Sequence, residues 1–163
     1  MDNHVHYIVV PKHEYSLSKM FNVAHMNYTQ YLNKKLRRNG PLWESRFYSC
    51  PLDDEHLYEA VRYVEKNPVK AGIVREPENY KWSSANARIR NLNDGIITKS
   101  IPLYKEIMSW KEYLLEPEHN VKISFIKKST KSGRPAGNRA FIKRIEKITG
   151  RNLKQNPVGR PKK

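Results

Sequence analysis

Two histidines, His4 and His6, are the first residues whose types and spacing could support chemistry. They begin a β-branched and aromatic stretch, which predicts a strand over residues 5–10 that Pro11 ends. Alternate side chains of a strand share one face, so both imidazoles would project the same way from Cα atoms roughly 7 Å apart. Such a pair can converge on one divalent cation, and it equally fits a half-exposed strand face without a metal.

A tyrosine and an asparagine, Tyr63 and Asn67, lie four positions apart on a second candidate element. Asp53 is a suitable N-cap, so we expect a helix from there to about Lys66, closed by Asn67-Pro68. Four apolar residues at helical spacing form its buried stripe: Leu57, Ala60, Val61 and Val64. Tyr63 lies on the flank of that stripe, where its ring can pack while its hydroxyl reaches a cleft. The alternative is an ordinary boundary tyrosine.

Together the two elements could cleave a phosphodiester. A tyrosine hydroxyl has a pKa of about 10 and is a poor nucleophile at neutral pH. A nearby metal can polarise the scissile phosphate and offset the charge of the transition state. The tyrosine can then attack phosphorus, form a 5′-phosphotyrosine link and release a 3′-hydroxyl. Because that link conserves the energy of the broken bond, the strand can be rejoined without ATP.

The charge of the chain is concentrated in its last quarter. The net charge is +15, and residues 121–163 hold 14 Lys or Arg against one acid, Glu146. A globular body with a basic tail is typical of a protein that binds a polyanion, with improved solubility as the alternative. The tripeptide Gly-Arg-Pro occurs at residues 133–135 and 159–161, and it is the centre of segments that enter the minor groove of A·T-rich DNA.

Composition narrows the class of protein. The chain of 163 residues fits one domain with a small appendage. A single cysteine, Cys50, excludes a disulfide or a Cys-rich zinc site within this chain. No apolar run approaches the ~20 residues that span a bilayer, and the N-terminal residues do not resemble a signal peptide. We therefore expect no membrane partner and a cytoplasmic, nucleoid-associated protein.

Three stretches resemble the single-tyrosine HUH transposases, the insertion-sequence-200-like family. Residues 1–6 resemble the His-hydrophobic-His motif of that family, and residues 42–47 (LWESRF) are similar to the strand between its two helices. Residues 62–74 (RYVEKNPVKAGIV) are similar to its tyrosine helix and the following turn, especially in the REP-associated branch. Trp82-Ser83-Ser84 also matches in kind, so the resemblance covers roughly residues 1–90.

The resemblance implies roles for particular residues. Tyr63 would be the nucleophile, and His4 and His6 would bind the metal. Asn67 stands where the family has a polar metal-proximal group, and an amide oxygen is an acceptable ligand for Mg²⁺ or Mn²⁺. The alternative for Asn67 is a helix C-terminal residue before proline. Basic side chains are expected to contact DNA: Arg46, Arg62, Lys66, Lys70, Arg134, Arg160, Lys162 and Lys163.

The family fold implies an α+β domain, a ferredoxin-like antiparallel sheet with helices on one face. The expected elements include the strand over 5–10, a helix with one buried stripe over 17–37, a strand over 46–52 and short helices near 83–89 and 107–115. We expect a catalytic domain over residues 1–120 and a basic DNA-binding extension over 121–163, with one short helix. Members usually carry a strand and a helix before the His pair, and here His4 follows Met1 by three residues. We therefore expect an N-terminally incomplete sheet, through an upstream start, a decayed ancestor or completion by a partner subunit.

Three functions remain open. The first is a transposase, or a domesticated relative, that cleaves single-stranded hairpin DNA through Tyr63, as a monomer or a homodimer. The second is a DNA-binding remnant or regulator without catalytic activity. The third is a metal-dependent phosphodiesterase that uses water and forms no covalent link to DNA.

Overall fold

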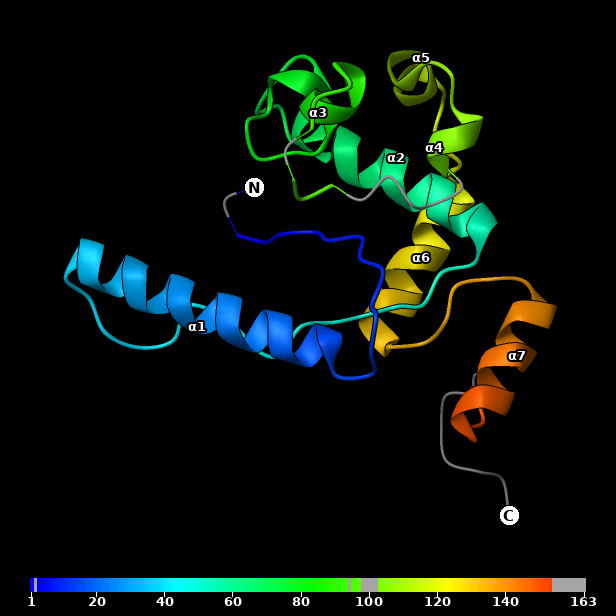
Figure 1. The fold of residues 1–163 in the computed structure, drawn as a ribbon, viewed down its shortest axis with the longest axis horizontal. Coiled ribbons are helices and arrows are strands. Elements are labelled where there is room, and N and C mark those ends of the chain that lie inside the picture. The colour runs from blue at the N-terminus through cyan, green and yellow to red at the C-terminus, as the bar shows by residue number, and fades with distance from the viewer. Residues whose placement is uncertain (2, 94, 98–102, 154–163) are drawn as a thin grey trace. The chain divides into compact units, whose positions relative to one another are not determined.

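The chain is a set of helices joined by loops (Figure 1). The computed structural model describes residues 1, 3–93, 95–97 and 103–153. In those ranges the elements are α1 (Ser16–Leu36), α2 (Asp54–Lys70), the 3-10 helix η1 (Pro77–Asn79), α3 (Ala85–Ile89), α4 (Leu103–Glu106), α5 (Trp110–Leu115), α6 (Asn120–Ser132) and α7 (Arg139–Thr149). The chain forms two units, one of residues 8–49 and one of residues 1–7 with the described residues from 50 onward.

The expected antiparallel sheet is absent from the described residues, so the ferredoxin-like prediction is wrong. Residues 5–10 and 46–51 belong to no strand there, and a single parallel bridge joins Leu52 to Ala136. β-Branched and aromatic side chains favour a strand because they fit a pleated, half-buried surface. A strand forms, however, only where a second backbone supplies its hydrogen bonds, and a local sequence pattern does not show whether one is present. Near the bridge, Asp53 N–H donates to the carbonyl of Ala136 (3.2 Å), and Ala136 N–H donates to that of Pro51 (2.8 Å).

The smaller unit is built on α1, close to the helix expected over 17–37. Its core is a short row of rings in which Phe21 is buried against Phe47 (4.6 Å between ring centres) and His25 stacks on Trp43 (3.9 Å). The predicted stripe also contains Leu17, Met20, Ala24, Tyr28, Tyr31 and Leu32. Leu17 and Leu32 are half-buried and the other four are exposed, so the prediction of a continuous buried stripe is wrong. That stripe was expected to pack on a sheet, and without the sheet these side chains have no apolar layer to cover them.

The helix α2 organises the larger unit. The carboxylate of Asp53 caps it by accepting from His56 N–H (2.9 Å), as expected for this residue type. The predicted end at Asn67-Pro68 is wrong, because α2 continues to Lys70. Pro68 lies inside the last turn, where it cannot donate to the carbonyl four residues before it, so α2 is one hydrogen bond short there. The helix instead ends with Gly72 in the left-handed region (φ +68°), whose N–H donates to the carbonyl of Val69 (2.9 Å).

The core of the larger unit lies along α2. Helices α5 and α6 and the turn η1 pack on α2, and α3 packs on η1 and α5. The buried apolar residues are Ala60, Val61, Ala85, Leu103, Trp110, Tyr113, Leu114, Ile123, Ile126, Ala136 and Phe141. In the part of the chain that the structure describes, no helix is long and apolar enough to cross a membrane.

The shorter helices agree with expectation in part. The helices expected near 83–89, near 107–115 and around Phe141 are confirmed as α3, α5 and α7. Sequence reasoning missed α6, which lies in a stretch rich in Ser, Thr and Lys. Its only strong signal is Ile123 and Ile126 at i, i+3 spacing, and both of these side chains are buried.

The Asp53 carboxylate should stabilise the fold in a pH-dependent way. Burial would raise its pKa, but hydrogen bonds from His56 and Asn138 outweigh burial and lower it below 3.8. Because the native pKa is depressed, this stabilisation is present above the unfolded pKa and disappears as the pH falls through the native pKa. We expect Asp53→Ala to lower the free energy of unfolding by about 1–2 kcal/mol at pH 7, and by less near pH 3, in denaturant titrations. Asp54→Ala is the control, and equal losses at both pH values would contradict the assignment.

Candidate functional site

The structure brings the two histidines and the tyrosine together. The rings of His4 and His6 meet edge-on with centres 4.9 Å apart, and the ring of His6 meets that of Tyr63 at 5.6 Å. Tyr63 is half-buried on α2, while both histidines are exposed on the segment over residues 1–7. Residues almost 60 positions apart in the sequence therefore form one cluster of rings.

The centres of the two histidine rings are separated by a distance that a shared cation would give and that an ordinary edge-on ring contact also gives. Two imidazoles whose nitrogens lie about 2.1 Å from one ion, at tetrahedral to octahedral angles, have centres roughly 4.5–5.3 Å apart, which brackets the 4.9 Å between the rings of His4 and His6. Nδ1 of His4 lies 2.7 Å from Oδ1 of Asn3, and this hydrogen bond leaves Nε2 as the nitrogen that can bind a metal. The pKa of His6 is lowered by partial burial and by repulsion from His4 and Lys127, which favours the neutral form that ligates metals.

Asn67 is the predicted third group at the metal site, beside His4 and His6. Among the described residues, no three His, Cys, Asp or Glu gather closely enough to hold a metal. A further ligand from these residues would therefore be of another type, such as an amide. Asn67 lies one turn beyond Tyr63 on α2, is 8% exposed, and has a buried Nδ2 without a hydrogen-bond partner in the described part of the chain. That atom is an N–H donor, so its lack of a partner is no sign of a bound cation. Since α2 continues past it, Asn67 is not the last residue of the helix.

Two lysines flank the tyrosine. Lys127 of α6 has its Nζ 4.8 Å from the centre of the Tyr63 ring, and Lys70 at the end of α2 has its Nζ at 5.5 Å. Lys70 also pairs with Glu118, whose side chain is nearly buried. A phosphate beside Tyr63 would therefore meet the positive charge of Lys127, while that of Lys70 is shared with Glu118.

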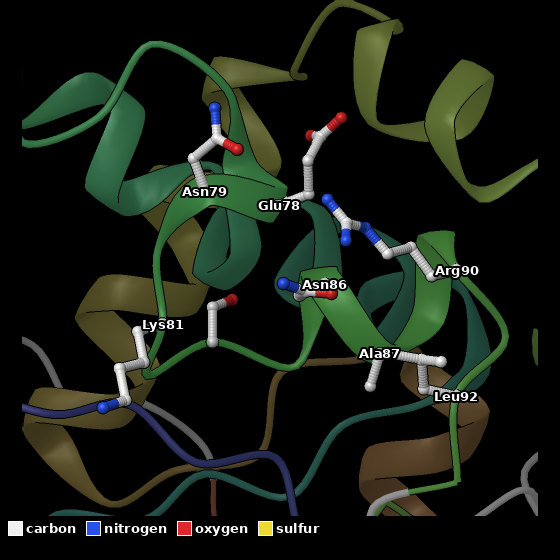
Figure 2. Close-up of a pocket in the computed structure, with 8 residues that line it drawn as sticks. Glu78, Asn79, Lys81, Asn86, Ala87, Arg90 and Leu92 are labelled. Carbon is white, nitrogen blue, oxygen red and sulfur yellow. The ribbon is translucent and has the colours of Figure 1, made fainter.

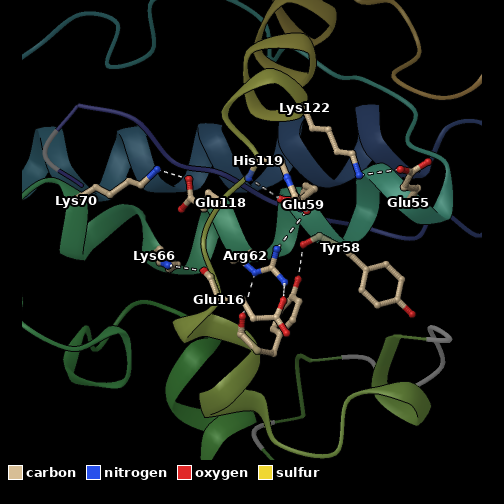
Figure 3. A network of polar contacts seen from close by, with 11 residues as sticks. Glu55, Tyr58, Glu59, Arg62, Lys66, Lys70, Glu116, Glu118, His119 and Lys122 are labelled. Carbon is tan, nitrogen blue, oxygen red and sulfur yellow. Dashed lines mark hydrogen bonds and ion pairs between the residues drawn. The ribbon is translucent and has the colours of Figure 1, made fainter.

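The predicted DNA contact of Arg62 is taken up by an internal network (Figure 3). Arg62 is 5% exposed and donates to Glu59 (3.2 Å), to Glu116 and to the carbonyl of Tyr113 (3.0 Å). The nearby Lys66 donates to the carbonyl of Glu116 (3.1 Å). Both side chains therefore join the connection between α5 and α6 to α2, and we leave Arg62 out of any DNA-binding surface.

Of the remaining predicted cations, the structure describes Arg46 and Arg134. Arg46 is exposed in the smaller unit. Arg134 follows α6, where its N–H donates to the carbonyl of Ser129 (2.9 Å) and one of its guanidinium nitrogens is buried. Arg160, Lys162 and Lys163 lie outside the described residues.

Lys127 is the site residue that sequence reasoning missed. It is one of 14 basic residues over 121–163, and nothing in its local spacing distinguishes it from its neighbours. Its approach to Tyr63 follows from the packing of α6 on α2. No local signal could have identified it, because the two residues are 64 positions apart in the sequence.

A family model matches the N-terminal part of the chain. Residues 1–67 match the model of the family described as "Transposase IS200 like". The matched residues include His4, His6, Tyr63 and Asn67, while Lys70 and Lys127 lie beyond them. No curated protein and no solved structure matches the chain. The match covers 67 of the 163 residues and agrees with the resemblance to the insertion-sequence-200-like transposases.

The network around Arg62 predicts a structural role for that residue. Removing the guanidinium would leave the buried carboxylate of Glu59 with only His119 as a partner among the described residues (3.8 Å), and breaking a buried pair costs about 3–5 kcal/mol. We expect Arg62→Ala to lower the free energy of unfolding by about that amount in denaturant titrations, and Lys66→Ala by under about 1 kcal/mol. Unchanged stability together with lost DNA affinity in Arg62→Ala would show that Arg62 instead contacts DNA.

Proposed function

We propose that the protein is a metal-dependent transposase that cleaves and rejoins single-stranded DNA through Tyr63. The observation that carries the proposal is the arrangement around that tyrosine, with a histidine pair on one side and two lysines within 5.5 Å of its ring centre. The family match over residues 1–67 supports the same class of activity. These groups would act together on one phosphate. The neutral imidazoles would bind a cation, the lysines would bind the anionic phosphate, and the tyrosine would supply the oxygen nucleophile.

The lysines would hold the scissile phosphate against the tyrosine. Lys127 and Lys70 would contact its non-bridging oxygens and offset the charge that develops on them. The Tyr63 oxygen attacks phosphorus and gives its proton to solvent. The bond from phosphorus to the 3′-oxygen breaks, and that oxygen takes up a proton to become a 3′-hydroxyl. The reverse attack by a 3′-hydroxyl rejoins the strand and restores the phenol.

His4 and His6 are the proposed metal ligands, with the Asn67 side chain as a polar third group. A bound Mg²⁺ or Mn²⁺ would act as a Lewis acid on a phosphate oxygen. The contact between Asn3 and His4 would orient one imidazole. We further propose a hairpin-bearing single strand as the substrate, a place in the REP-associated branch and action as a homodimer, all of which rest on the sequence resemblance.

A DNA-binding protein without cleavage activity is the second candidate. It is favoured by the lack of a sheet beneath the histidine pair in the described residues, since catalytic groups need rigid support. In this case the basic charge would bind DNA while Tyr63 formed no covalent bond.

The covalent intermediate separates these candidates. The full chain is incubated with labelled single-stranded hairpin DNA and Mn²⁺, and a denaturation-resistant protein–DNA band is sought. We expect a band that disappears with Tyr63→Phe and with chelator, and that falls sharply with His6→Ala. Tyr28→Phe is the matched control and should leave the band intact. Cleavage that persists in Tyr63→Phe without an adduct would indicate a phosphodiesterase that uses water, while DNA binding with neither product would favour the non-catalytic protein.

Lys127 should affect the rate of adduct formation. Removing one preorganised charge-stabilising group typically slows such a step by about 10²–10³-fold. We expect Lys127→Ala to slow adduct formation about 100-fold, with little change in the free energy of unfolding because the residue is exposed. Lys128→Ala, its exposed neighbour on α6, is the control. Equal effects of the two changes would indicate only a general loss of basic charge.

A further inference from the structure

The last described helix of the larger unit has one face whose charges are all positive. Five exposed residues of α7 form this cationic face: Arg139, Ala140, Lys143, Arg144 and Lys147. A helix turns by about 100° per residue, so the five side chains lie within about 140° of one another. Arg139, Lys143 and Lys147 follow at intervals of four residues and form a row about 12 Å long.

This row of cations is unfavourable for a helix without a partner. Lys143 has a like charge four residues away on either side, at Arg139 and Lys147, and such pairs destabilise a helix. The one acid of α7, Glu146, lies outside the cationic face and accepts the N–H of Leu153 (2.8 Å). A helix face that only meets solvent typically carries charges of both signs. The single sign on α7 therefore indicates an anionic partner that offsets the repulsion.

Contacts at its first turn hold α7 against the start of α2. Oδ1 of Asp53 accepts from His56 N–H (2.9 Å), and Oδ2 accepts from the N–H of Asn138 (2.7 Å), the residue that caps α7. Gly137 lies so close to the ring of Phe141 that a Cβ there would be 2.3 Å from Cδ1 of the ring. One carboxylate thus fixes the beginning of the cationic helix and the beginning of the helix that carries the candidate site.

The Gly-Arg-Pro tripeptide at residues 133–135 forms the link that leads into α7. Gly133 ends α6 in the left-handed region (φ +68°), and the N–H of Arg134 donates to the carbonyl of Ser129 (2.9 Å). Arg134 is half-buried and Pro135 is buried. This tripeptide therefore sets the direction of the chain, while the cations of α7 remain exposed.

The other side of α7 indicates which kind of anion fits. Phe141 is buried and Ile142 and Ile145 are half-buried, while Ile148 at the end of the helix is exposed. Most of the apolar side that would enter a membrane is thus covered by the protein itself. Phe141 is the only aromatic residue of α7, so the cationic face has no ring on which the bases of a single strand could stack. A row of cations without rings suits the phosphates of a duplex, whose major groove, about 12 Å wide, admits a helix.

A cavity elsewhere in the larger unit has no comparable charge. It has a volume of about 460 Å³ and lies beside η1 and α3 (Figure 2). The charged residues of its lining are one acid and two cations, Glu78 with Lys81 and Arg90. Because its lining carries both signs, this cavity does not favour a polyanion as the cationic face does.

We propose that the cationic face of α7 binds the backbone of duplex DNA. Arg139, Lys143 and Lys147 contact successive phosphates, and Arg144 lies at the edge of the contact. Phosphate contacts position a protein on DNA but carry no sequence information, so this binding is independent of sequence. If Tyr63 cleaves a hairpin, the bound duplex is its stem. That identification rests on the proposed function, whereas the binding of a duplex does not.

Binding is measured in the full-length chain carrying Tyr63→Phe, so that no covalent product forms. A labelled duplex and oligo(dT) of equal length are titrated by fluorescence anisotropy at several salt concentrations. We expect the double change Lys143→Ala and Lys147→Ala to weaken duplex binding by roughly 2- to 25-fold. The slope of log K against log salt concentration should fall by about two, because two phosphate contacts are lost. The loss of affinity for oligo(dT) should be smaller.

An added negative charge tests the face without removing any side chain from it. Ala140→Glu places a carboxylate among the cations, in the first turn of α7, where an acid complements the helix dipole. We expect it to weaken duplex binding while the helix content stays unchanged by circular dichroism. Ala24→Glu, the same change at an exposed alanine of α1, is the matched control. Equal losses from the two changes would reflect net charge alone and would overturn the proposal.

The remaining outcomes also decide the assignment. An unchanged salt slope in the double variant, or equal losses for the duplex and oligo(dT), overturns duplex binding by α7. Loss of binding to phosphatidylserine vesicles with unchanged duplex binding overturns it in favour of a lipid surface. If the chain with Tyr63 restored forms adducts while Ala140→Glu binds duplexes normally, the proposed function stands and the role of α7 fails. If no adduct forms but Ala140→Glu selectively loses duplexes, the role of α7 stands and the cleavage function fails.

Discussion

Two buried carboxylates on α2 constrain the larger unit. Glu59 and Glu65 are 5% and 1% exposed, and an unpaired charge at such depth is costly enough to unfold a small domain. Arg62 pairs with Glu59, while Arg88, Ser84 and Trp110 satisfy Glu65. Segments distant in the sequence must therefore return to α2, and burial raises the pKa of Glu65 despite these partners.

The candidate site lies beside this buried frame. Tyr63 lies between Glu59 and Glu65 in the sequence, on the flank of α2 that the buried carboxylates leave accessible. The contacts of Ser84 and Arg88 with Glu65 likewise attach residues 84–88 to α2. The partners that neutralise Glu59 and Glu65 thus fix the backbone segments that carry them against α2. The groups capable of chemistry lie on the surfaces that these contacts leave exposed.

The sheet that we expected, and that the described residues lack, shows that a local sequence pattern does not predict tertiary pairing. Residues 5–10 have the composition of a strand, yet they pair with no other strand in the described part of the chain. On α1 the spacing predicted one buried face, and of the residues in it only Phe21 is buried. Both errors have one source, because a strand and an amphipathic face each need a second surface that lies elsewhere in the chain.

Local sequence alone determined several of the helices and the residue types capable of chemistry. The Asp53 cap, the helices α1, α2 and α7, and the candidate set of His4, His6 and Tyr63 could be predicted, because caps and helical spacing act over a few residues. Tertiary structure alone decided that Arg62 is buried in an ion network, that Lys127 approaches Tyr63, and that Asp53 also holds the first turn of α7. These outcomes depend on which distant segments satisfy buried polar groups and charges, and that choice is made by the packing of the whole unit.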